Sequence, residues 1–167
     1  MNCVLIPIKN ISKHYLKSFD CGIEPLNIYL QRYALKNDSL EIGKTFIAIN
    51  DDSKIIGYFT LCSAQINFDE MPIDFQTRLP RYPIPALRIA RLAVDKTMQG
   101  QGVGKWLMQQ AFIKIIQVAD IAGVHVIIVD AKETAVSFYK QFGFIKLKQT
   151  DNSYFIPITT VRKAIYG

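Results

Sequence analysis

The 167-residue sequence lacks the features of membrane-spanning, disulfide-stabilised and zinc-binding proteins. No apolar run approaches the roughly 18 residues that span a bilayer, and the first eight residues lack the basic start of a signal peptide. Cys3, Cys21 and Cys62 are widely spaced and form no C-x-x-C pair, which argues against a disulfide framework and a zinc site. We therefore expect a cytoplasmic protein with no metal and no membrane attachment.

Linkers, internal repeats and low-complexity segments are also missing. With 50% hydrophobic residues, a chain of this length can bury a substantial core. No Ser-, Gly- or Pro-rich stretch divides it. The sequence therefore predicts a single domain over residues 1–167.

Acidic residues are scarce in the middle of the chain. The net charge is +6, and Asp95 is the only acid between Gln76 and Gln110. Six basic residues lie in the same range: Arg78, Arg81, Arg88, Arg91, Lys96 and Lys105. This concentration would attract an anionic cofactor or an RNA. A solvated basic face without a partner is the alternative.

A glycine-rich stretch covers residues 99–104, with glycines at Gly100, Gly102 and Gly104. It lies between a strand-like run at 86–94 and an amphipathic helix that is expected to end before Gly123. Glycines let several backbone N–H groups turn toward one point, and a helix N-terminus favours an anion there. The stretch therefore predicts a phosphate-binding loop; a surface turn that merely reverses the chain is the alternative.

The remaining pattern predicts strands and helices in alternation. Strands are expected at residues 3–8, 45–50, 55–63, 86–94, 124–129, 144–147 and 153–158, and helices after Ser12 and at 25–35, 103–122 and 133–142. The second and third strands should form an antiparallel hairpin, and the last two strands another. Residues 37–43 are expected to be loop, and the four prolines within 68–85 predict an irregular segment there.

Three polar side chains fall within predicted strands. Arg88 and Arg91 lie on opposite faces of the strand at 86–94, so each needs a partner, an open end of the sheet or a bound anion. His125 interrupts an apolar run that is typical of a strand covered on both sides. We expect His125 to be a hydrogen-bonded or edge residue rather than a catalytic base.

Two motifs together resemble the GNAT superfamily of N-acetyltransferases. Gln99, Gly102 and Gly104 match its Q/R-x-x-G-x-G/A loop, and residues 135–144 resemble its A-x-x-F-Y-x-x-x-G-F segment. A P-loop does not fit, because Trp106 stands where Ser or Thr is required. The resemblance implies an α/β protein with the GNAT fold: a mixed, mostly antiparallel central sheet with splayed central strands, flanked by helices.

The same resemblance implies acetyl-coenzyme A as cofactor and assigns its site. Main-chain groups of Leu92, Ala93 and Val94 would align the pantetheine and polarise the thioester carbonyl. The other cofactor-binding residues that it implies are Gln99, Gly100, Gln101, Gly102, Val103, Gly104, Lys105, Asp130 and Ala135. Lys132 departs from the family pattern, because many relatives carry an asparagine three residues before the alanine.

Tyr139 matches the family tyrosine that protonates the departing thiolate, and a phenol is protonated at neutral pH. A core tyrosine beside Phe138 and Phe142 is the alternative. No spacing singles out a general base. An α-amino group, with a pKa of about 8, is substantially neutral in the cell and can react without one.

A narrower resemblance is to the acetyltransferase toxins of bacterial toxin–antitoxin pairs. It runs from residues 19–22 (Phe-Asp-Cys-Gly) through 88–95 to 130–144. It implies acetylation of the amino group of aminoacyl-tRNA, which blocks translation, and a ribbon-helix-helix antitoxin as partner; a homodimer is left open. The candidate tRNA contacts are Arg78, Arg81, Arg88 and Arg91, with Lys36 and Lys44.

Two other classes of function stay open. One is a GNAT enzyme that acetylates a small-molecule amine or a protein N-terminus, which would share the cofactor residues. The other is a module that binds coenzyme A or RNA without catalysis.

Overall fold

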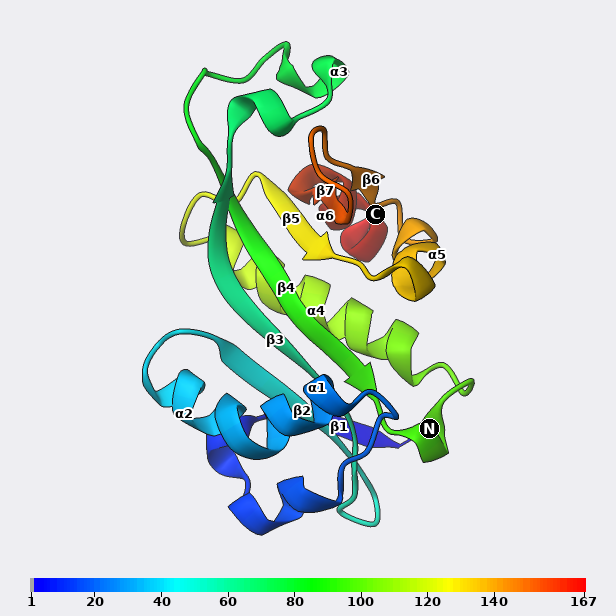
Figure 1. The fold of residues 1–167 in the computed structure, drawn as a ribbon. Coiled ribbons are helices and arrows are strands. Elements are labelled where there is room, and N and C mark those ends of the chain that lie inside the picture. The colour runs from blue at the N-terminus through cyan, green and yellow to red at the C-terminus, as the bar shows by residue number, and fades with distance from the viewer. Residues whose placement is uncertain (1) are drawn as a thin grey trace. The chain divides into compact units, whose positions relative to one another are not determined.

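The computed structural model describes residues 2–167, and Figure 1 shows the order of the elements. The strands are β1 (Cys3–Pro7), β2 (Lys44–Asn50), β3 (Ile55–Ile66), β4 (Ile84–Val94), β5 (Val126–Asp130), β6 (Ile145–Lys146) and β7 (Ser153–Pro157). The helices are α1 (Glu24–Ile28), the π-helix η3 (Tyr29–Tyr33), α2 (Ala34–Ser39), α3 (Ile73–Gln76), α4 (Val103–Ala119), α5 (Val136–Lys140) and α6 (Ile158–Tyr166). The 3-10 helices are η1 (Ile8–Asn10), η2 (Lys13–Ser18), η4 (Phe68–Glu70), η5 (Lys96–Met98) and η6 (Glu133–Ala135).

The seven strands form one sheet in the order β1-β2-β3-β4-β5-β7-β6. Four neighbouring pairs are antiparallel: β1 with β2, β2 with β3, β5 with β7, and β6 with β7. The predicted α/β class is confirmed, as is the mixed, mostly antiparallel sheet with flanking helices. Both predicted hairpins are also confirmed.

The chain separates into two compact units. Of the described residues, unit 1 comprises 2–62 and 89–111, and unit 2 comprises 63–88 and 112–167. The long elements β3, β4 and α4 each begin in one unit and end in the other. The glycine loop therefore belongs to unit 1, and the segment that carries Tyr139 belongs to unit 2.

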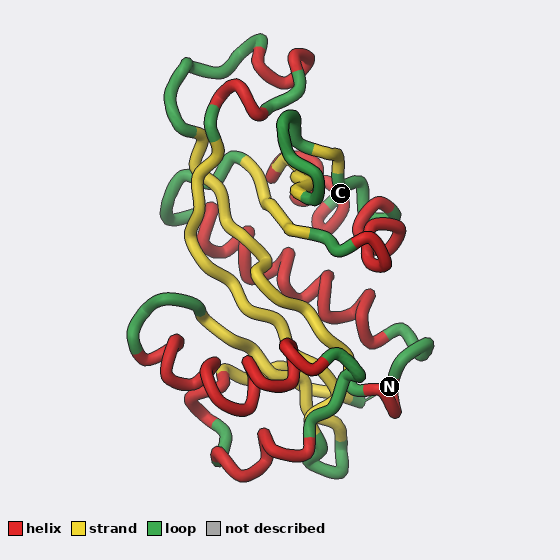
Figure 2. The backbone as a smooth tube through the Cα atoms, viewed as in Figure 1, coloured by secondary structure: helices red, strands yellow, loops and turns green. Residues whose placement is uncertain are grey.

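The core of unit 1 forms between its strands and a helical run, α1-η3-α2, which Figure 2 shows in red. Leu30 and Ala34 on this run are fully buried in the same cluster as Ile47 of β2. The run extends to Ser39, so the loop predicted at residues 37–43 is wrong for residues 37–39, which are helical. The buried Asp38 carboxylate accepts a hydrogen bond from the Thr45 backbone N–H (3.1 Å), a tertiary contact that local sequence does not reveal.

α4 begins in unit 1, where its first turns pack closely on β3. A Cβ added to Gly57 would lie 2.7 Å from Leu107 Cδ1 and 2.9 Å from the Ala93 carbonyl oxygen. Gly57 therefore permits an approach that any larger residue would prevent. The helix ends at Ala119 rather than at the predicted residue 122, because the following turn exposes Ile121 and has no apolar face to bury.

The core of unit 2 surrounds β5, whose Val126–Val129 stretch is fully buried. Phe155 of β7 and Met71 belong to this core. His125 lies just before β5; its backbone N–H donates to the Pro85 carbonyl (2.9 Å) and its carbonyl accepts from the Ile158 N–H (2.9 Å). Burial lowers the pKa of the His125 imidazole, which favours its neutral form at pH 7.

Two features of unit 2 were not predicted. Residues 68–85 contain the short helices η4 and α3, and Pro72 stands immediately before α3, where proline is tolerated. The chain also ends in a helix, α6, which is anchored by the buried side chains of Ile158 and Val161. Ile158, Val161 and Ile165 recur at spacings of three and four, which is a helical pattern, but the strand expected at 153–158 overlaps its start. None of the helices in the described part of the chain has the length and hydropathy needed to traverse a bilayer.

Candidate active site

The glycine loop of unit 1 connects the end of β4 to the start of α4. Gly100 and Gly102 have φ angles of +76° and +85°, a left-handed conformation that glycine adopts without strain. Nothing lies within 4 Å of the position of a Cβ at either residue. The glycines are therefore required by the path of the backbone, and they leave its outer side open to a ligand.

The N-terminus of α4 supplies hydrogen-bond donors at the end of this loop. The helix is 17 residues long, and its first hydrogen bond joins the Trp106 N–H to the Gly102 carbonyl (3.1 Å). The N–H groups of Val103, Gly104 and Lys105 therefore lack partners within the helix. With the helix dipole, they form a site for a phosphate or pyrophosphate, and the exposed Lys105 side chain adds positive charge.

The last residues of β4 carry the main-chain groups predicted to align the pantetheine. Ala93 is buried, and Leu92 and Val94 are half-buried. The Asp95 N–H donates to the Ile56 carbonyl (2.9 Å), which holds the end of β4 against β3. The cofactor contacts of these residues remain predictions.

Gln99, the first residue of the motif, has a role that its place in the motif did not indicate. Its side-chain Nε2 donates to the carbonyl oxygens of Cys21 and Val94, each at 2.9 Å. The amide therefore ties the glycine loop both to the end of β4 and to residues 19–22. This side chain braces the loop, and the backbone remains the part available to a phosphate.

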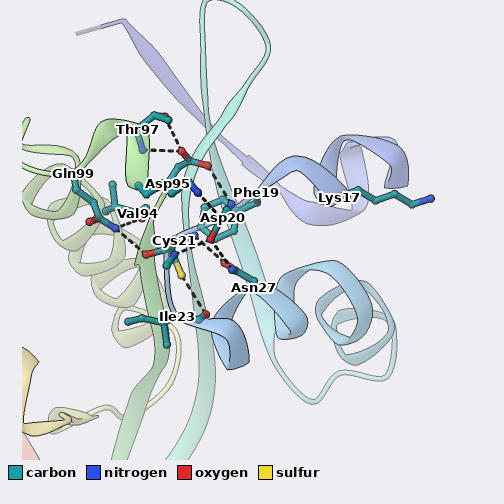
Figure 3. A network of polar contacts seen from close by, with 12 residues as sticks. Lys17, Phe19, Asp20, Cys21, Ile23, Asn27, Val94, Asp95, Thr97 and Gln99 are labelled. Atoms are coloured by element: carbon teal, nitrogen blue, oxygen red, sulfur yellow. Dashed lines mark hydrogen bonds and ion pairs between the residues drawn. The ribbon is translucent and has the colours of Figure 1, made fainter.

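Asp95 is the centre of a polar network beneath the loop, shown in Figure 3. Asp95 directly follows β4, and the residue is only 2% exposed. It accepts hydrogen bonds from the Asp20 N–H (3.2 Å), the Thr97 N–H (3.0 Å) and the Thr97 hydroxyl (2.7 Å). Lys54 Nζ lies 3.6 Å away and donates to the Thr97 hydroxyl (2.9 Å).

The second half of the network fixes the turn at residues 19–22. Asp20 Oδ1 accepts from the Gly22 N–H and from Asn27 Nδ2, both at 2.9 Å. Asn27 Oδ1 in turn accepts from the Cys21 N–H (2.8 Å). Lys96 Nζ forms an ion pair with Asp20 Oδ2 (2.9 Å). The turn and the glycine loop are thus held together by side chains that lie more than 70 residues apart in the chain.

Both carboxylates of the network are ionised at neutral pH. The hydrogen bond from Lys96, helped by those from Gly22 and Asn27, lowers the pKa of Asp20 to about 2. For Asp95, burial alone would raise the pKa, but the hydrogen bonds from Thr97 and the Asp20 backbone, with the charge of Lys54, outweigh it and lower the pKa. Ionised acceptors make these hydrogen bonds stronger than neutral ones.

Tyr139 lies in unit 2, on α5, and its side chain packs among aromatic rings. Its ring centroid is 5.3 Å from that of Phe138 and 5.7 Å from that of Phe144, both edge-to-face. Burial raises the pKa of Tyr139 to about 12. The phenol is therefore protonated throughout the physiological range, as a proton donor must be, and the aromatic contacts fix the orientation of its ring.

Asp130 and Ala135, the other residues predicted to bind cofactor, also lie in unit 2. Asp130 ends β5 and forms an ion pair with Arg88, while its other oxygen accepts a hydrogen bond from the Ser153 hydroxyl (2.7 Å). Ala135 closes η6 and donates its N–H to the Lys132 carbonyl (2.8 Å). The Asp130 carboxylate is thus held by neighbouring strands of the same unit.

The four arginines predicted to contact tRNA have different surroundings. Arg88 is paired with Asp130, and the guanidinium of Arg91 stacks 3.5 Å from the centroid of the Tyr29 ring in unit 1. These two interactions supply the partners that the strand positions required. In unit 2, Arg81 lies 5.5 Å from the Phe68 ring centroid, and both Arg78 and Arg81 are exposed.

Sequence analysis did not assign a role to Asn27, Asp95 or Thr97. A signal was present, because Asp95 directly follows the predicted strand at 86–94 and precedes the glycine loop. The 19–22 segment was noted only as part of a resemblance. Its partners became identifiable only when folding brought it to the end of β4.

With this geometry in place, comparison with known proteins identifies the class. The chain belongs to the GNAT acetyltransferase family, because the model of the Acetyltransferase (GNAT) domain matches residues 20–165. The predicted GNAT fold is therefore confirmed, and the protein is an acetyltransferase that uses acetyl-coenzyme A. The exposed glycine loop and the free N–H groups of α4 are suited to holding the pyrophosphate of this cofactor.

Individual relatives have a more specific function than the description of the family gives. A tRNA-acetylating toxin of Mycobacterium tuberculosis is 30% identical over 151 residues, which are 90% of this chain and 89% of that protein. The structure of AtaT complexed with acetyl-methionyl-tRNAfMet has a TM-score of 0.90 at 28% identity and covers 98% of this chain and 99% of that one. A tyrosine-to-phenylalanine mutant of AtaT, bound to acetyl-CoA and the C-terminus of the antitoxin AtaR, has a TM-score of 0.81 at 25% identity, covering 99% of each chain.

Proposed function

We propose that the protein transfers acetyl from acetyl-coenzyme A to the α-amino group of aminoacyl-tRNA and thereby blocks translation as the toxin of a toxin–antitoxin pair. The observation that carries the proposal is the near full-length similarity to a tRNA-acetylating toxin. The fold shared with AtaT in its acetylated-tRNA complex supports it, as does the excess of basic residues in the sequence.

In this proposal the pyrophosphate and the acyl arm of the cofactor are held by residues of unit 1, and Asp130 and Ala135 remain proposed cofactor contacts. The cofactor supplies the acetyl group as a reactive thioester. The N–H groups of Val103, Gly104 and Lys105 bind its pyrophosphate, together with the backbone of residues 99–102. Main-chain groups of residues 92–94 orient the acyl arm. The side chains of Gln99 and Asp95 hold the loop and the strand end in their relative positions.

Tyr139 is the proposed general acid. Transfer of acetyl to an amine breaks the carbon–sulfur bond, so the departing thiolate needs a proton, and the attacking amine must lose one. A phenol is protonated at neutral pH, and burial raises the pKa of Tyr139 further, to about 12, so Tyr139 holds a proton at its phenol oxygen. The α-amine of an aminoacyl group, with a pKa of about 8, loses its proton to solvent without a dedicated base.

We further propose that the partner is a ribbon-helix-helix antitoxin and that the toxin acts in the cytoplasm as a single domain over residues 1–167. The complex of AtaT with the antitoxin AtaR supports a protein partner. Co-expression with the small reading frame beside the gene tests this: an antitoxin restores growth and co-purifies with the toxin. An unrelated small protein would do neither.

The activity is tested by incubating the purified protein with acetyl-coenzyme A and bulk aminoacyl-tRNA. The expected product is N-acetyl-aminoacyl-tRNA, detected by mass spectrometry after hydrolysis of the ester. Deacylated tRNA serves as the matched control and should not react. Acetylation of a small amine or a peptide N-terminus, with none of aminoacyl-tRNA, would contradict the proposal. Binding of coenzyme A without release of its thiol to any amine would contradict catalysis.

A further inference from the structure

Unit 1 contains a hollow of about 530 Å³ that lies on elements outside the glycine loop. It is lined by residues of η1, η2, η3, α2, the loop that follows α2 and the start of β2. Its charged residues are five bases, Lys9, Lys13, Arg32, Lys36 and Lys44, and two acids, Asp38 and Glu41. We call it the basic hollow.

The two acids of the basic hollow share one ion-pair partner, Lys44. Lys44 Nζ lies 2.8 Å from Glu41 Oε2 and 3.6 Å from Asp38 Oδ1. The hydrogen bond to Glu41 raises the pKa of Lys44, and the same bond lowers the pKa of Glu41. Lys44, which sequence analysis proposed as a tRNA contact, therefore serves as an internal counter-ion.

The other four bases face solvent. Lys9, Lys13, Arg32 and Lys36 are all exposed, and no ion pair among residues 2–167 includes any of them. Arg32 and Lys36 are four residues apart on the helical run, so they lie on one face. With five bases and two acids, the lining has a net charge of +3, and this excess around one concave surface produces a positive potential that attracts a polyanion.

The other residues that line the basic hollow indicate whether the polyanion is a peptide or a nucleic acid. Leu35 is the only apolar residue among those that line the basic hollow. A bound peptide depends on apolar or aromatic anchors that fill matching pockets, and this surface offers almost none. A nucleic-acid backbone needs only positive charges and hydrogen-bond donors, and the ammonium and guanidinium groups of the four exposed bases supply both.

We infer that the basic hollow binds backbone phosphates of the RNA acceptor, with Lys13, Arg32 and Lys36 as the contacting residues. The inference rests on the proposed function, which supplies the RNA, and it places a substrate contact away from the cofactor loop. It adds Lys13 and Arg32 to the tRNA contacts predicted from the sequence. Phosphate contacts of this kind position a substrate without reading its sequence.

The test is a triple variant, Lys13→Ala, Arg32→Ala and Lys36→Ala. Its matched control is Lys146→Ala, Lys148→Ala and Lys163→Ala, which removes three exposed positive charges from unit 2. Binding of aminoacyl-tRNA is measured between 50 and 300 mM salt, and acetyl-coenzyme A affinity and circular dichroism are measured in parallel. Three lost phosphate contacts should reduce the slope of log K against log salt by about 2 to 3 and weaken binding roughly 100-fold near 0.1 M salt.

The control should lose much less affinity, and both variants should keep the wild-type affinity for acetyl-coenzyme A. Equal losses in the two variants, or an unchanged salt slope in the first, would overturn the inference. So would an acidic peptide whose binding is lost in the triple variant while tRNA binding is kept. If the wild-type protein binds tRNA but does not acetylate it, the proposed function fails, and the salt slopes still decide whether the hollow binds RNA.

Discussion

Asp95→Asn is the change that most directly tests the network beneath the glycine loop. The wild-type carboxylate accepts three hydrogen bonds and lies near Lys54. The amide keeps the shape of the side chain, but its NH₂ group must face one of the N–H or O–H donors. A hydrogen bond to a charged group contributes about 1.5 to 3 kcal/mol, and an unsatisfied buried donor adds a cost.

We therefore expect the variant to lose about 2 to 3 kcal/mol of stability. In a chain of this size each kcal/mol lowers the melting temperature by roughly 2 to 4 °C, so the expected decrease is roughly 4 to 12 °C. The assay is thermal unfolding followed by circular dichroism. Asp120→Asn is the control, because it breaks an exposed ion pair with Arg162, a type that contributes only about 0 to 1 kcal/mol.

The same variant has a second expected effect. Thr97 and Gln99 belong to the segment that leads into the glycine loop, so loss of the Asp95 contacts should weaken acetyl-coenzyme A binding in calorimetry. A melting temperature no lower than that of the control would refute the assigned strength of the network. A lower melting temperature with unchanged cofactor affinity would refute its link to the loop.

Four further predictions concern catalysis and pH. Tyr139→Phe should lower kcat by about 10²- to 10⁴-fold, as loss of a general acid does, and leave acetyl-coenzyme A affinity intact in calorimetry. Unchanged turnover would mean that Tyr139 only packs in the core and is not the general acid. The wild-type rate should rise up to a pH of about 8 and not fall before pH 10, because the pKa of Tyr139 is about 12. Gly102 has a φ of +85°, so Gly102→Ala adds about 1 to 2 kcal/mol of left-handed backbone strain. The exposed loop can relieve this strain only by moving. Cofactor affinity should therefore fall about 5- to 30-fold, with little change in melting temperature. Asp20→Asn should lower the melting temperature at pH 6, and the melting temperatures of variant and wild type should converge as the pH falls from about 4 to 2. The reason is that the pKa of Asp20 is lowered to about 2 in the folded protein, so its stabilisation is lost as the carboxylate is protonated. A difference in melting temperature that persists undiminished at pH 2 would contradict this.

Much of the fold was predictable because it follows from local patterns. The hairpin of β2 and β3 follows from β-rich runs around a short polar connection, and the burial of β5 follows from its unbroken aliphatic stretch. The loop that leads into α4 was also predictable from a local pattern, since Gly100 and Gly102 adopt a backbone conformation that few other residues adopt. Each of these signals lies within a few residues of the structure that it predicts.

Elements whose stability depends on distant contacts were not predictable. The last turn of α2 is held by Asp38 through its bond to Thr45. The partner of Arg88 lies 42 residues away, on another strand. Sequence periodicity carries no information about such partners, because they are chosen by the packing of the sheet.

By itself the sequence determined the class of the protein: strands in alternation with helices, a glycine loop for an anion and an aromatic segment that carries Tyr139. Only the tertiary structure decided what holds that loop, because Asp95 and Gln99 find their partners at Asp20 and Cys21, 75 and 78 residues away. The same is true of the basic hollow, whose charges come from five separate elements. Local conformation depends on neighbouring residues, whereas a site is assembled from side chains that meet only when the core has formed.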